Sequence, residues 1–488
     1  MKLTKTRIVL LTVMVIALAF IVLLPKNVYA TAKYGDLEYT LSNGEITINS
    51  CDKNATSVTI PEKIVGYTVT KIGYSAFEDC TKLKTVTLNK GLKEMEIYAF
   101  KNCTSLTSIT FPSTLLEIGS YTFQGCTSLN SVNFGKLQKI GYGAFESCSS
   151  LSTINFPASV NNIEGYSFGN TALTQVVVPS TVKYFGASVF SGCKSLKSAA
   201  INADISLLDD SVFENCSSLV NVTLNDKIEF MEFRIFKGCT SLKEVTLPAK
   251  LSYVKNYIFE DCPNLVKVVF PEQTLFSNAN RVFGEERNAN LKLYVIRGSA
   301  AEELAINNGI KFEYYQVDIS KCKISGISNK VYTGKNISQT ALAVGFLDKK
   351  LTKGTDYTVS YSSNKNVGQA KVIIKGIGKY KGSITKIFII KPKGTSLKKL
   401  TSGKKQIKIT WNKRVAQTTG YQIQYSTNSK FKSGNKTVKI TKTKTTSKTI
   451  KKLKAKKKYY VRIRTYKTVN GKTYYSGWSK IKNVTTKK

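Results

Sequence analysis

Cysteine is the residue type in this chain whose spacing could support chemistry, through metal binding, disulfide formation or a reactive thiol. Eight of the ten cysteines recur every 22 or 23 residues, with one gap of 45. They are Cys80, Cys103, Cys126, Cys148, Cys193, Cys216, Cys239 and Cys262. This spacing predicts a line of thiols, whereas a tetrahedral metal site needs a cluster, so we expect no metal and no cofactor. Two interpretations stay open: small buried residues, or disulfides between neighbouring repeats. Cys51 and Cys322 lie outside the repeat phase and should pack within their own modules.

The chain contains no histidine, which excludes several classes of enzyme. A Ser-His-Asp triad, a Cys-His pair and an HExxH zinc site all need an imidazole. Asp209 and Asp210 are the remaining carboxylate pair to consider. In a strand they would point to opposite faces, and in a turn they would be solvated. The sequence therefore predicts no catalytic residue and no enzyme activity.

Lysine could act through its charge, because the formal net charge of +42 is concentrated near the C-terminus. Residues 393–488 contain 29 basic residues, 26 of them lysines, and no acidic residue. These positive charges repel one another within the folded module, which predicts a polyanion partner. The alternative is a surface that only keeps the protein soluble. Lysine favours diffuse attraction over bidentate phosphate recognition, and no nucleic-acid reading motif is present. The candidate polyanion contacts are Lys451, Lys452, Lys454, Lys456, Lys457, Lys458, Arg462 and Arg464.

A phenylalanine repeat defines the elements that must position these residues. Steps of 22 or 23 residues separate Phe77, Phe100, Phe123, Phe145, Phe168, Phe190, Phe213, Phe236 and Phe259. A period of this length is typical of a solenoid, in which each repeat contacts only its neighbours. After each Phe, the pattern Leu-x-x-Val/Ile-x-Leu/Phe predicts one short strand, and these strands would stack into a parallel sheet. We expect a helical turn or irregular coil to form the opposite wall. The fifth repeat is one residue short and lacks its cysteine.

The residues between the inward-pointing ones should form the solvent face of this sheet. The face is flat, short-chained and almost uncharged, which suits either a plain exposed strand or a platform for a protein or glycan. It carries no row of aromatic residues, which weakens the case for a sugar ligand. The candidate partner-binding residues are Thr85, Thr87, Ser108, Thr110, Ser131, Asn133, Thr153, Asn155, Gln175, Asn221, Thr223, Glu244 and Thr246.

The repeat unit resembles the BspA-type leucine-rich repeat family of bacterial surface proteins. Residues 71–80 (KIGYSAFEDC) and 139–148 (KIGYGAFESC) are close to the consensus of that family. The resemblance extends over about residues 34–315, and the pattern decays after Phe283 into what looks like a capping unit. It implies adhesion to host proteins or to other cells.

Two small β modules are expected after the solenoid. Residues 317–392 alternate β-rich runs with glycines and resemble bacterial Ig-like stalk modules. Residues 393–488 resemble a fibronectin type III domain, with Trp411 in the second strand and Tyr459 at the tyrosine corner. The predicted fold class is therefore a leucine-rich repeat solenoid with a parallel sheet, followed by two all-β sandwich modules.

The N-terminus predicts export. Three basic residues precede an apolar run over residues 8–24, and small residues follow at a potential cleavage site before residue 31. We expect a signal peptide at residues 1–30, with an uncleaved anchor as the alternative. The solenoid would then span residues 31–316, ahead of the modules at 317–392 and 393–488.

These features together predict a secreted, cell-wall-associated monomer without catalytic activity. The solenoid would bind a host or bacterial surface protein. The cationic modules would act as a spacer and an electrostatic tether to an anionic cell-wall polymer. The alternative function is an extracellular carbohydrate-binding accessory protein of a polysaccharide-degrading system.

Overall fold

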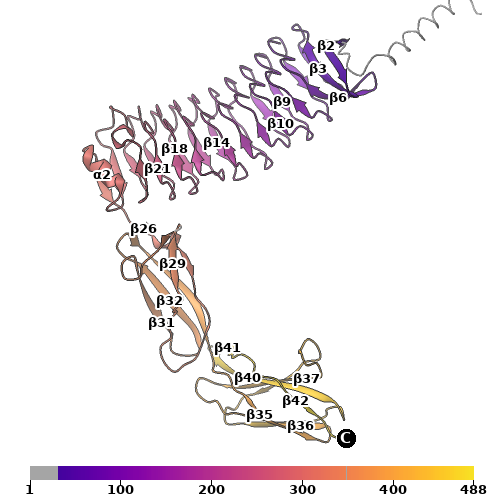
Figure 1. The fold of residues 1–488 in the computed structure, drawn as a ribbon, viewed down its shortest axis with the longest axis vertical. Coiled ribbons are helices and arrows are strands. Elements are labelled where there is room, and N and C mark those ends of the chain that lie inside the picture. The colour runs from indigo at the N-terminus through magenta and orange to yellow at the C-terminus, as the bar shows by residue number, and fades with distance from the viewer. Residues whose placement is uncertain (1–30, 348) are drawn as a thin grey trace, which may run out of the picture. The chain divides into compact units, whose positions relative to one another are not determined.

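The computed structural model describes residues 31–347 and 349–488, so the predicted signal peptide lies outside the described residues. The chain divides after Tyr315 into two compact units. The first is a β-solenoid, and the second holds two antiparallel β modules (Figure 1). The predicted fold class is confirmed.

Antiparallel strands begin the solenoid. β1 (Ala32–Tyr34), β2 (Leu37–Ser42) and β3 (Glu45–Cys51) pair in sequence order. β3 then pairs in parallel with β6 (Tyr67–Ile72), against which β5 (Lys63–Ile64) also packs. This arrangement covers the edge of the repeat array with a hydrogen-bonded partner, which an exposed parallel strand would lack.

The predicted parallel strands form one wall of the solenoid. Their pairing divides the wall into four ladders: β4–β7, β9–β11, β14–β16–β18 and β20–β22–β24–β25. The strands are β4 (Ser57–Thr59), β7 (Thr85–Thr87), β9 (Ser108–Thr110), β11 (Ser131–Asn133), β14 (Gln175–Val178), β16 (Ser198–Ile201), β18 (Asn221–Leu224), β20 (Glu244–Thr246), β22 (Lys267–Val269), β24 (Lys292–Val295) and β25 (Lys311–Tyr314).

One predicted strand is missing from this wall. Residues 154–156 have no strand conformation, so Thr153 and Asn155 lie on an irregular segment. The segment is 22 residues from each neighbouring strand position, whereas β9 and β11, or β14 and β16, are 23 apart. The shorter step alone does not explain the missing strand, because other strands of the solenoid pair across 22 residues, for example Glu117 with Lys139.

A second parallel sheet forms the opposite wall, where we expected a helical turn or coil. Most of its strands are only two residues long, and each brings one side chain into the core. They are β8 (Glu94–Met95), β10 (Glu117–Ile118), β12 (Lys139–Ile140), β13 (Asn162–Ile163), β15 (Tyr184–Phe185), β17 (Leu207–Leu208), β19 (Phe230–Met231), β21 (Tyr253–Val254) and β23 (Leu275–Phe276). The expectation was wrong for the aliphatic residue before each Phe, because two residues are too few to show the alternation that identifies a strand. It was right for the Phe residues themselves, which lie in turns.

The repeated phenylalanines stack along the core between the walls. Phe77 and Phe100 lie with ring centroids 4.5 Å apart, and the stack continues from turn to turn up to Phe283. The two residues flanking each Phe at −2 and +2 have left-handed backbone, for example Tyr98 and Asn102 (φ 60° and 58°). These two bends turn the chain sharply enough to bury the ring while the next repeat begins.

A helix completes the C-terminal end of the solenoid. After η1 (Ala279–Arg281), α2 (Ala300–Asn307) lies between β24 and β25 and buries Leu304 and Ala305. Ser299 caps it, since its Oγ accepts the Glu302 N–H at 3.3 Å. Within the described residues, no helix is long and apolar enough to cross a membrane.

The second unit begins with the module that we expected to be Ig-like. A sheet in the order β28–β34–β32–β31 packs its apolar face on Ile319 and Tyr380. The module contains β26 (Val317–Asp318), η2 (Ile319–Lys321), β27 (Lys323–Ser325), β28 (Lys330–Val331), β29 (Ala343–Phe346), β30 (Lys349–Lys350), β31 (Tyr357–Ser362), β32 (Gly368–Gly376), β33 (Tyr380–Lys381) and β34 (Ser383–Lys391).

The last module is a sandwich of a three-stranded and a five-stranded sheet. Trp411 is fully buried in its core, and the Tyr459 hydroxyl accepts the Lys454 N–H at 3.2 Å, as a tyrosine corner would. Its strands are β35 (Leu397–Gly403), β36 (Gln406–Trp411), β37 (Gly420–Ser426), β38 (Lys436–Ile440), β39 (Ser447–Ile450), β40 (Lys458–Val469), β41 (Lys472–Tyr475) and β42 (Lys482–Thr485).

Candidate functional site

The predicted partner-binding residues all lie exposed on the first wall, and pairing aligns most of them into two columns. Ser108 and Thr110 pair with Ser131 and Asn133, and the same alternation recurs from β14 to β18 and from β20 to β22. Thr153 and Asn155 are exposed as well, although their segment has no strand. We name these residues the threonine face. The structure brings them together as an extended surface.

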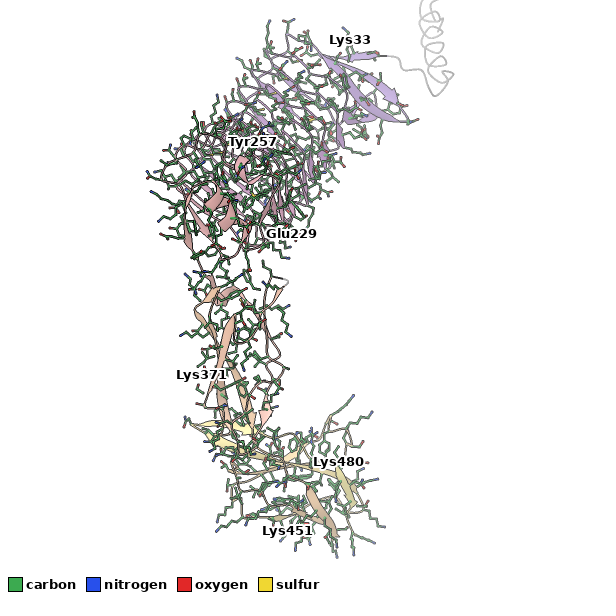
Figure 2. All side chains as sticks on the ribbon, turned by 60° about the vertical axis from the view of Figure 1, so that its left-hand side comes forward. Lys33, Glu229, Tyr257, Lys371, Lys451 and Lys480 are labelled. Carbon is green, nitrogen blue, oxygen red and sulfur yellow. The ribbon has the colours of Figure 1, made fainter. Side chains whose placement is uncertain are left out.

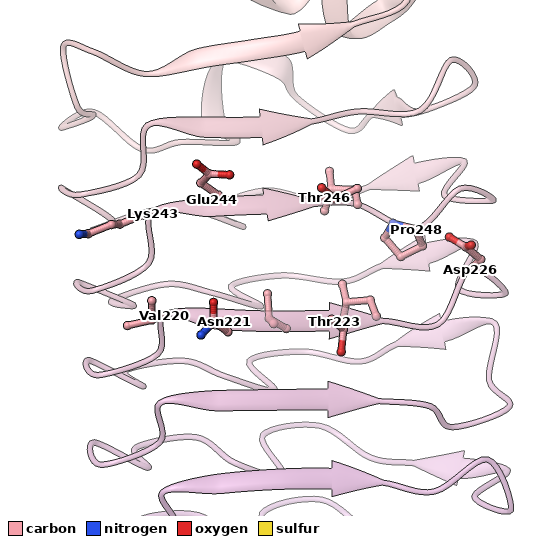
Figure 3. Close-up of a pocket in the computed structure, with 11 residues that line it drawn as sticks. Val220, Asn221, Thr223, Asp226, Lys243, Glu244, Thr246 and Pro248 are labelled. Atoms are coloured by element: carbon pink, nitrogen blue, oxygen red, sulfur yellow. The ribbon is translucent and has the colours of Figure 1, made fainter. Parts of the chain in front are cut away.

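A shallow groove crosses the threonine face between β18 and β20 (Figure 3). Asn221 and Thr223 line one side, and Glu244 and Thr246 line the other. The Glu244 carboxylate pairs with Lys267 at 2.8 Å on the next strand. The groove therefore offers hydroxyl and amide groups for hydrogen bonding, next to one ion pair. The charged residues Lys243 and Asp226 also line it.

The cysteine line is a row of hydrogen-bond donors. In each of seven repeats the thiol donates to the carbonyl of the Phe in the preceding repeat, at 3.1 or 3.2 Å. All ten cysteines are free and buried. Burial raises the pKa of Cys193 to about 11 and that of Cys262 to about 12. These two thiols are therefore protonated at neutral pH. Of the two interpretations left open by the sequence, small buried residues or disulfides between repeats, the structure shows buried free thiols.

Two departures from the cysteine repeat find a structural explanation. In the short fifth repeat Thr171 stands at the cysteine position, and its hydroxyl donates to the Phe168 carbonyl at 2.8 Å. Cys51 extends the line at its N-terminal end, since its pKa is raised by a hydrogen bond with Cys80 and by burial. This agrees with the prediction that Cys51 packs within its own module, since it belongs to the solenoid core. Among the described residues, no group of acidic or cysteine side chains could hold a metal ion.

Asp209 and Asp210 bind backbone groups. Asp210 accepts the Phe233 N–H of the next repeat at 2.8 Å, and Asp209 accepts the N–H of Asp210 at 2.9 Å. Each carboxylate is thus used to fix the turn after β17. The pair has the geometry of a structural cap.

The second wall presents a surface that sequence reasoning missed. Its outer column changes from charged residues in β8, β10 and β12 to large apolar residues in β15, β17, β19 and β23. The apolar members are Tyr184 (54% exposed), Leu207 (40%), Phe230 (42%) and Leu275 (58%). The signal was present in the sequence, in the residue before each inward aliphatic of this wall. It was overlooked because this wall was expected to be coil.

A row of tyrosines follows the bend beside the second wall. Tyr74, Tyr98, Tyr121, Tyr142 and Tyr166 contact one another in turn, with ring centroids 5.3 to 5.7 Å apart. Tyr98 and Tyr121 are nearly parallel, so each covers a face of the other. Lys101 lies over the Tyr98 ring at 4.7 Å. The row leaves hydroxyls and ring edges at the surface, because the ring faces are used within the row.

The six predicted lysine contacts, from Lys451 to Lys458, are all exposed. Figure 2 labels Lys451 and Lys480, two of the many lysines on this module. The two predicted arginine contacts are placed differently. Arg462 lies between the rings of Phe431 and Trp478, at 4.2 and 4.6 Å, and donates to Gln424 at 2.5 and 2.8 Å.

Arg464 continues the same stack. Its guanidinium lies 4.3 Å from the Trp478 ring and 3.9 Å from the Tyr475 ring, and its Nε donates to Gln422 at 2.6 Å. Desolvation lowers the pKa of both guanidinium groups. Aromatic rings cover the faces of both guanidinium groups. The two arginines are therefore partly shielded from solvent, whereas the six lysines are exposed.

Comparison with family models identifies two regions. Residues 47–174 and 161–289 match the BspA type leucine rich repeat region, and residues 391–482 match the fibronectin type III domain. None of the curated proteins compared with the chain matches it.

Several solved structures are similar to the solenoid. A leucine rich cell surface protein from Faecalibacterium prausnitzii A2-165 is 20% identical, with 58% of this chain and 99% of that chain covered and a TM-score of 0.33. The leucine rich repeat protein of T. pallidum is 29% identical, with 44% and 91% covered and a TM-score of 0.34. The pneumococcal vaccine antigen PcpA is 18% identical, with 60% and 100% covered and a TM-score of 0.34.

Proposed function

We propose a function from the premise that this chain joins a BspA-type leucine-rich repeat region to a fibronectin type III domain. The protein is a non-catalytic surface or secreted protein. Its solenoid binds a protein on another cell through the threonine face, and its cationic modules serve as spacer and tether to an anionic cell-wall polymer. The observation that carries the proposal is the separation of charge from the recognition surface. Residues 393–488 hold 29 basic and no acidic residues, whereas the threonine face is almost uncharged.

The threonine face supports recognition of a folded partner. Its side chains are short, so they keep little conformational entropy to lose on binding, and they repeat at the spacing of the strands. The extended wall exceeds the size of a small-molecule site and suits a protein surface. The groove at β18 and β20 adds a place where a partner side chain can insert.

Binding through the threonine face is tested with a charge-matched pair of variants. One variant carries Thr110→Glu, Thr223→Glu and Thr246→Glu on the face. The control carries Thr81→Glu, Thr127→Glu and Thr240→Glu, which are exposed positions beside the cysteine line. Adhesion of residues 31–488 to cultured host cells is measured at a salt concentration that abolishes electrostatic attachment, with and without prior trypsin treatment of the cells.

We expect the face variant to lose adhesion and the control to retain it, and trypsin to remove the target. Equal adhesion by both variants would refute the assignment of this face. In that case substitution of Leu207 and Phe230 on the second wall would show whether the apolar column binds instead. Adhesion that resists trypsin would exclude a protein partner.

The tether is tested with purified wall sacculi. Residues 31–488 should be retained at low salt on sacculi that carry their anionic polymers, and released when the polymers are extracted or the salt is raised. Retention that does not depend on salt or polymer would contradict an electrostatic tether.

A further inference from the structure

Three segments that are distant in sequence meet at one end of the fibronectin type III domain. The Leu453 N–H donates to the Lys405 carbonyl at 3.0 Å, which joins the loop before β40 to the turn between β35 and β36. The Lys487 N–H donates to the Gly403 carbonyl at 3.0 Å, and the Thr486 N–H donates to the Lys457 carbonyl at 3.1 Å. The end of the chain is thus fixed to both other segments.

Each of these three segments carries adjacent lysines, so the contacts between the segments concentrate positive charge at this end of the domain. We name the set the lysine pole. All of its side chains are exposed. Its members are Lys404, Lys405, Lys451, Lys452, Lys454, Lys456, Lys457, Lys458, Lys487 and Lys488. Sequence reasoning found only the middle segment, because Lys405 lies 46 residues before Lys451 and Lys487 lies 29 residues after Lys458.

The backbone of the lysine pole is unusual for lysine. Lys405, Lys452 and Lys456 have φ values of 48°, 59° and 49°. Glycine or asparagine occupies this left-handed conformation at lower cost, because the Cβ of other residues crowds the following carbonyl. The module therefore holds lysine at three positions where the backbone favours another residue. Strain of this kind concentrates at functional sites.

The opposite end of the module has a different environment. Tyr474, which follows the β40–β41 turn, is buried in a cluster with Phe388 and Ile390 of the preceding module. Gln417 there donates to Asn366 at 3.1 Å. Lysines at that end, such as Lys413 and Lys442, lie on separate loops. They provide a control set with the same residue type on the same domain.

We propose that the lysine pole is the binding site for a linear phosphodiester polymer of the cell wall. This inference rests on the tether in the proposed function and names its site and ligand. Lysine binds phosphate as a compact point charge without a fixed geometry, which suits a flexible chain with regularly spaced phosphates. Three lysine-bearing segments present a surface on which several consecutive phosphates can each meet a charge. No Asp or Glu side chain within residues 393–488 competes for those charges.

The test compares two variants of residues 31–488 that carry equal net charge. The pole variant is Lys404→Gln, Lys451→Gln, Lys454→Gln, Lys457→Gln and Lys487→Gln. The control variant is Lys393→Gln, Lys413→Gln, Lys442→Gln, Lys444→Gln and Lys472→Gln, all of which are also exposed. The probe is a purified glycerol-phosphate polymer, and its dissociation constant is measured across a salt series. Heparin, a sulfated glycan, is measured in parallel.

We expect the pole variant to lower the slope of log affinity against log salt by about 3, since each lost phosphate contact removes about 0.7 for a flexible strand. The control should keep most of the slope of the unmodified protein. Thermal unfolding should show both variants folded, because removing like charges relieves repulsion.

The remaining outcomes separate failure of the site from failure of the tether. Equal weakening in both variants would overturn the lysine pole and leave a diffuse electrostatic tether in place. If the unmodified protein fails to bind the polymer at low salt, the tether is overturned as well. Tighter binding to heparin than to the phosphate polymer would overturn the ligand class and point to a host glycan.

Discussion

Cysteine occupies the repeated position because a thiol is small, fits the core and can still donate. The Phe100 carbonyl illustrates the arrangement: it accepts the Cys103 N–H at 3.2 Å and the Cys126 thiol at 3.1 Å. Both lone pairs of the carbonyl are thus used, one within its own repeat and one by the next repeat. At the corresponding position of the fifth repeat, the Thr171 hydroxyl instead donates to the Phe168 carbonyl of its own repeat.

We expect Cys126→Val to lower the free energy of unfolding by about 1 kcal/mol, because valine keeps the volume but loses the donor. Cys126→Ser keeps the donor and should cost less. Chemical denaturation of both variants measures the difference. A valine variant as stable as the unmodified protein, together with a less stable serine variant, would show that the thiol only fills space.

Alkaline pH should weaken the solenoid through its buried thiols. The folded-state pKa of Cys193 is about 11 and that of Cys262 about 12, above the ordinary value of about 8.5. The unfolded chain therefore loses these protons first as pH rises. The stability that the thiols contribute is complete below about pH 8.5 and is lost between there and about pH 11 to 12.

Denaturation at a series of pH values checks this. The double variant Cys193→Ser, Cys262→Ser should show a flatter decline above pH 8.5 than the unmodified protein, since serine does not titrate. Lysine and tyrosine also titrate in this range, but they do so equally in both proteins. Identical curves would mean that the buried thiols do not contribute.

Glycine controls how closely consecutive turns approach after the second wall. A Cβ added to Gly141 would lie 2.5 Å from the carbonyl carbon and oxygen of Gly119, and one added to Gly119 would lie 2.6 Å from the Glu96 carbonyl carbon. These neighbours are backbone atoms, which cannot move aside without breaking the ladder. The contact is steric, because neither glycine has a positive φ.

We therefore expect Gly141→Ala to destabilise the solenoid by about 2 kcal/mol. Gly91→Ala is the matched control, because its Cβ would find its nearest neighbour at 3.5 Å. That change should be neutral or slightly stabilising. Thermal unfolding of the two variants decides the matter, and equal melting temperatures would contradict the close-approach argument.

The sequence predicted those elements that carry a long-period signal. Phe77 and its successors fixed the repeat, and the Leu-x-x-Val-x-Leu pattern located the strands of the first wall. The second wall was missed because strands such as β10 span two residues, which is too short for a pattern. The strand expected at residues 154–156 does not form, although the alternation there matches that of its neighbours. At the candidate site, the exposure of the threonine face followed from alternation alone.

Contacts between distant segments were beyond what the sequence could show. The stack of Arg462, Trp478 and Arg464 needs a strand and a C-terminal segment to lie side by side. The lysine pole likewise needs the turn at Lys405 and the segment at Lys487 to meet. Neither contact can be predicted from local composition, because each depends on how the strands of the sandwich pair and pack.

At the scale of the whole molecule, most of the positive charge and the proposed recognition surface belong to different units of the chain. Residues 1–316 have 30 basic and 28 acidic residues, and residues 317–392 have 14 and 3. The charge therefore increases along the chain and is greatest in the last module. Salt screens exposed charges over about 8 Å at physiological ionic strength. The electrostatic attraction of the last module therefore acts over a short distance, which changes with salt concentration.

Deletion of residues 393–488 should reduce retention on wall sacculi at low salt and leave little salt dependence, because the most cationic module is gone. The retained fraction is measured at low and high salt for the deleted and undeleted chains. Adhesion to host cells at high salt should be unaffected, which serves as the control for folding of the solenoid. Undiminished salt-sensitive retention after the deletion would assign the tether to residues 317–392.

The thiol-to-carbonyl bonds described above each cross a single repeat, as do the strand pairings of both walls. Most contacts of a repeat are therefore made with its two neighbours, and the exceptions lie near the ends, such as Tyr315 with Phe270 and Lys93 with Glu45. Under a pulling force, the turns would detach one at a time from an end, each releasing roughly 75 Å of chain. Under the proposed function, a cell attached through this protein in flowing liquid would be held by a connection that lengthens in steps before it breaks.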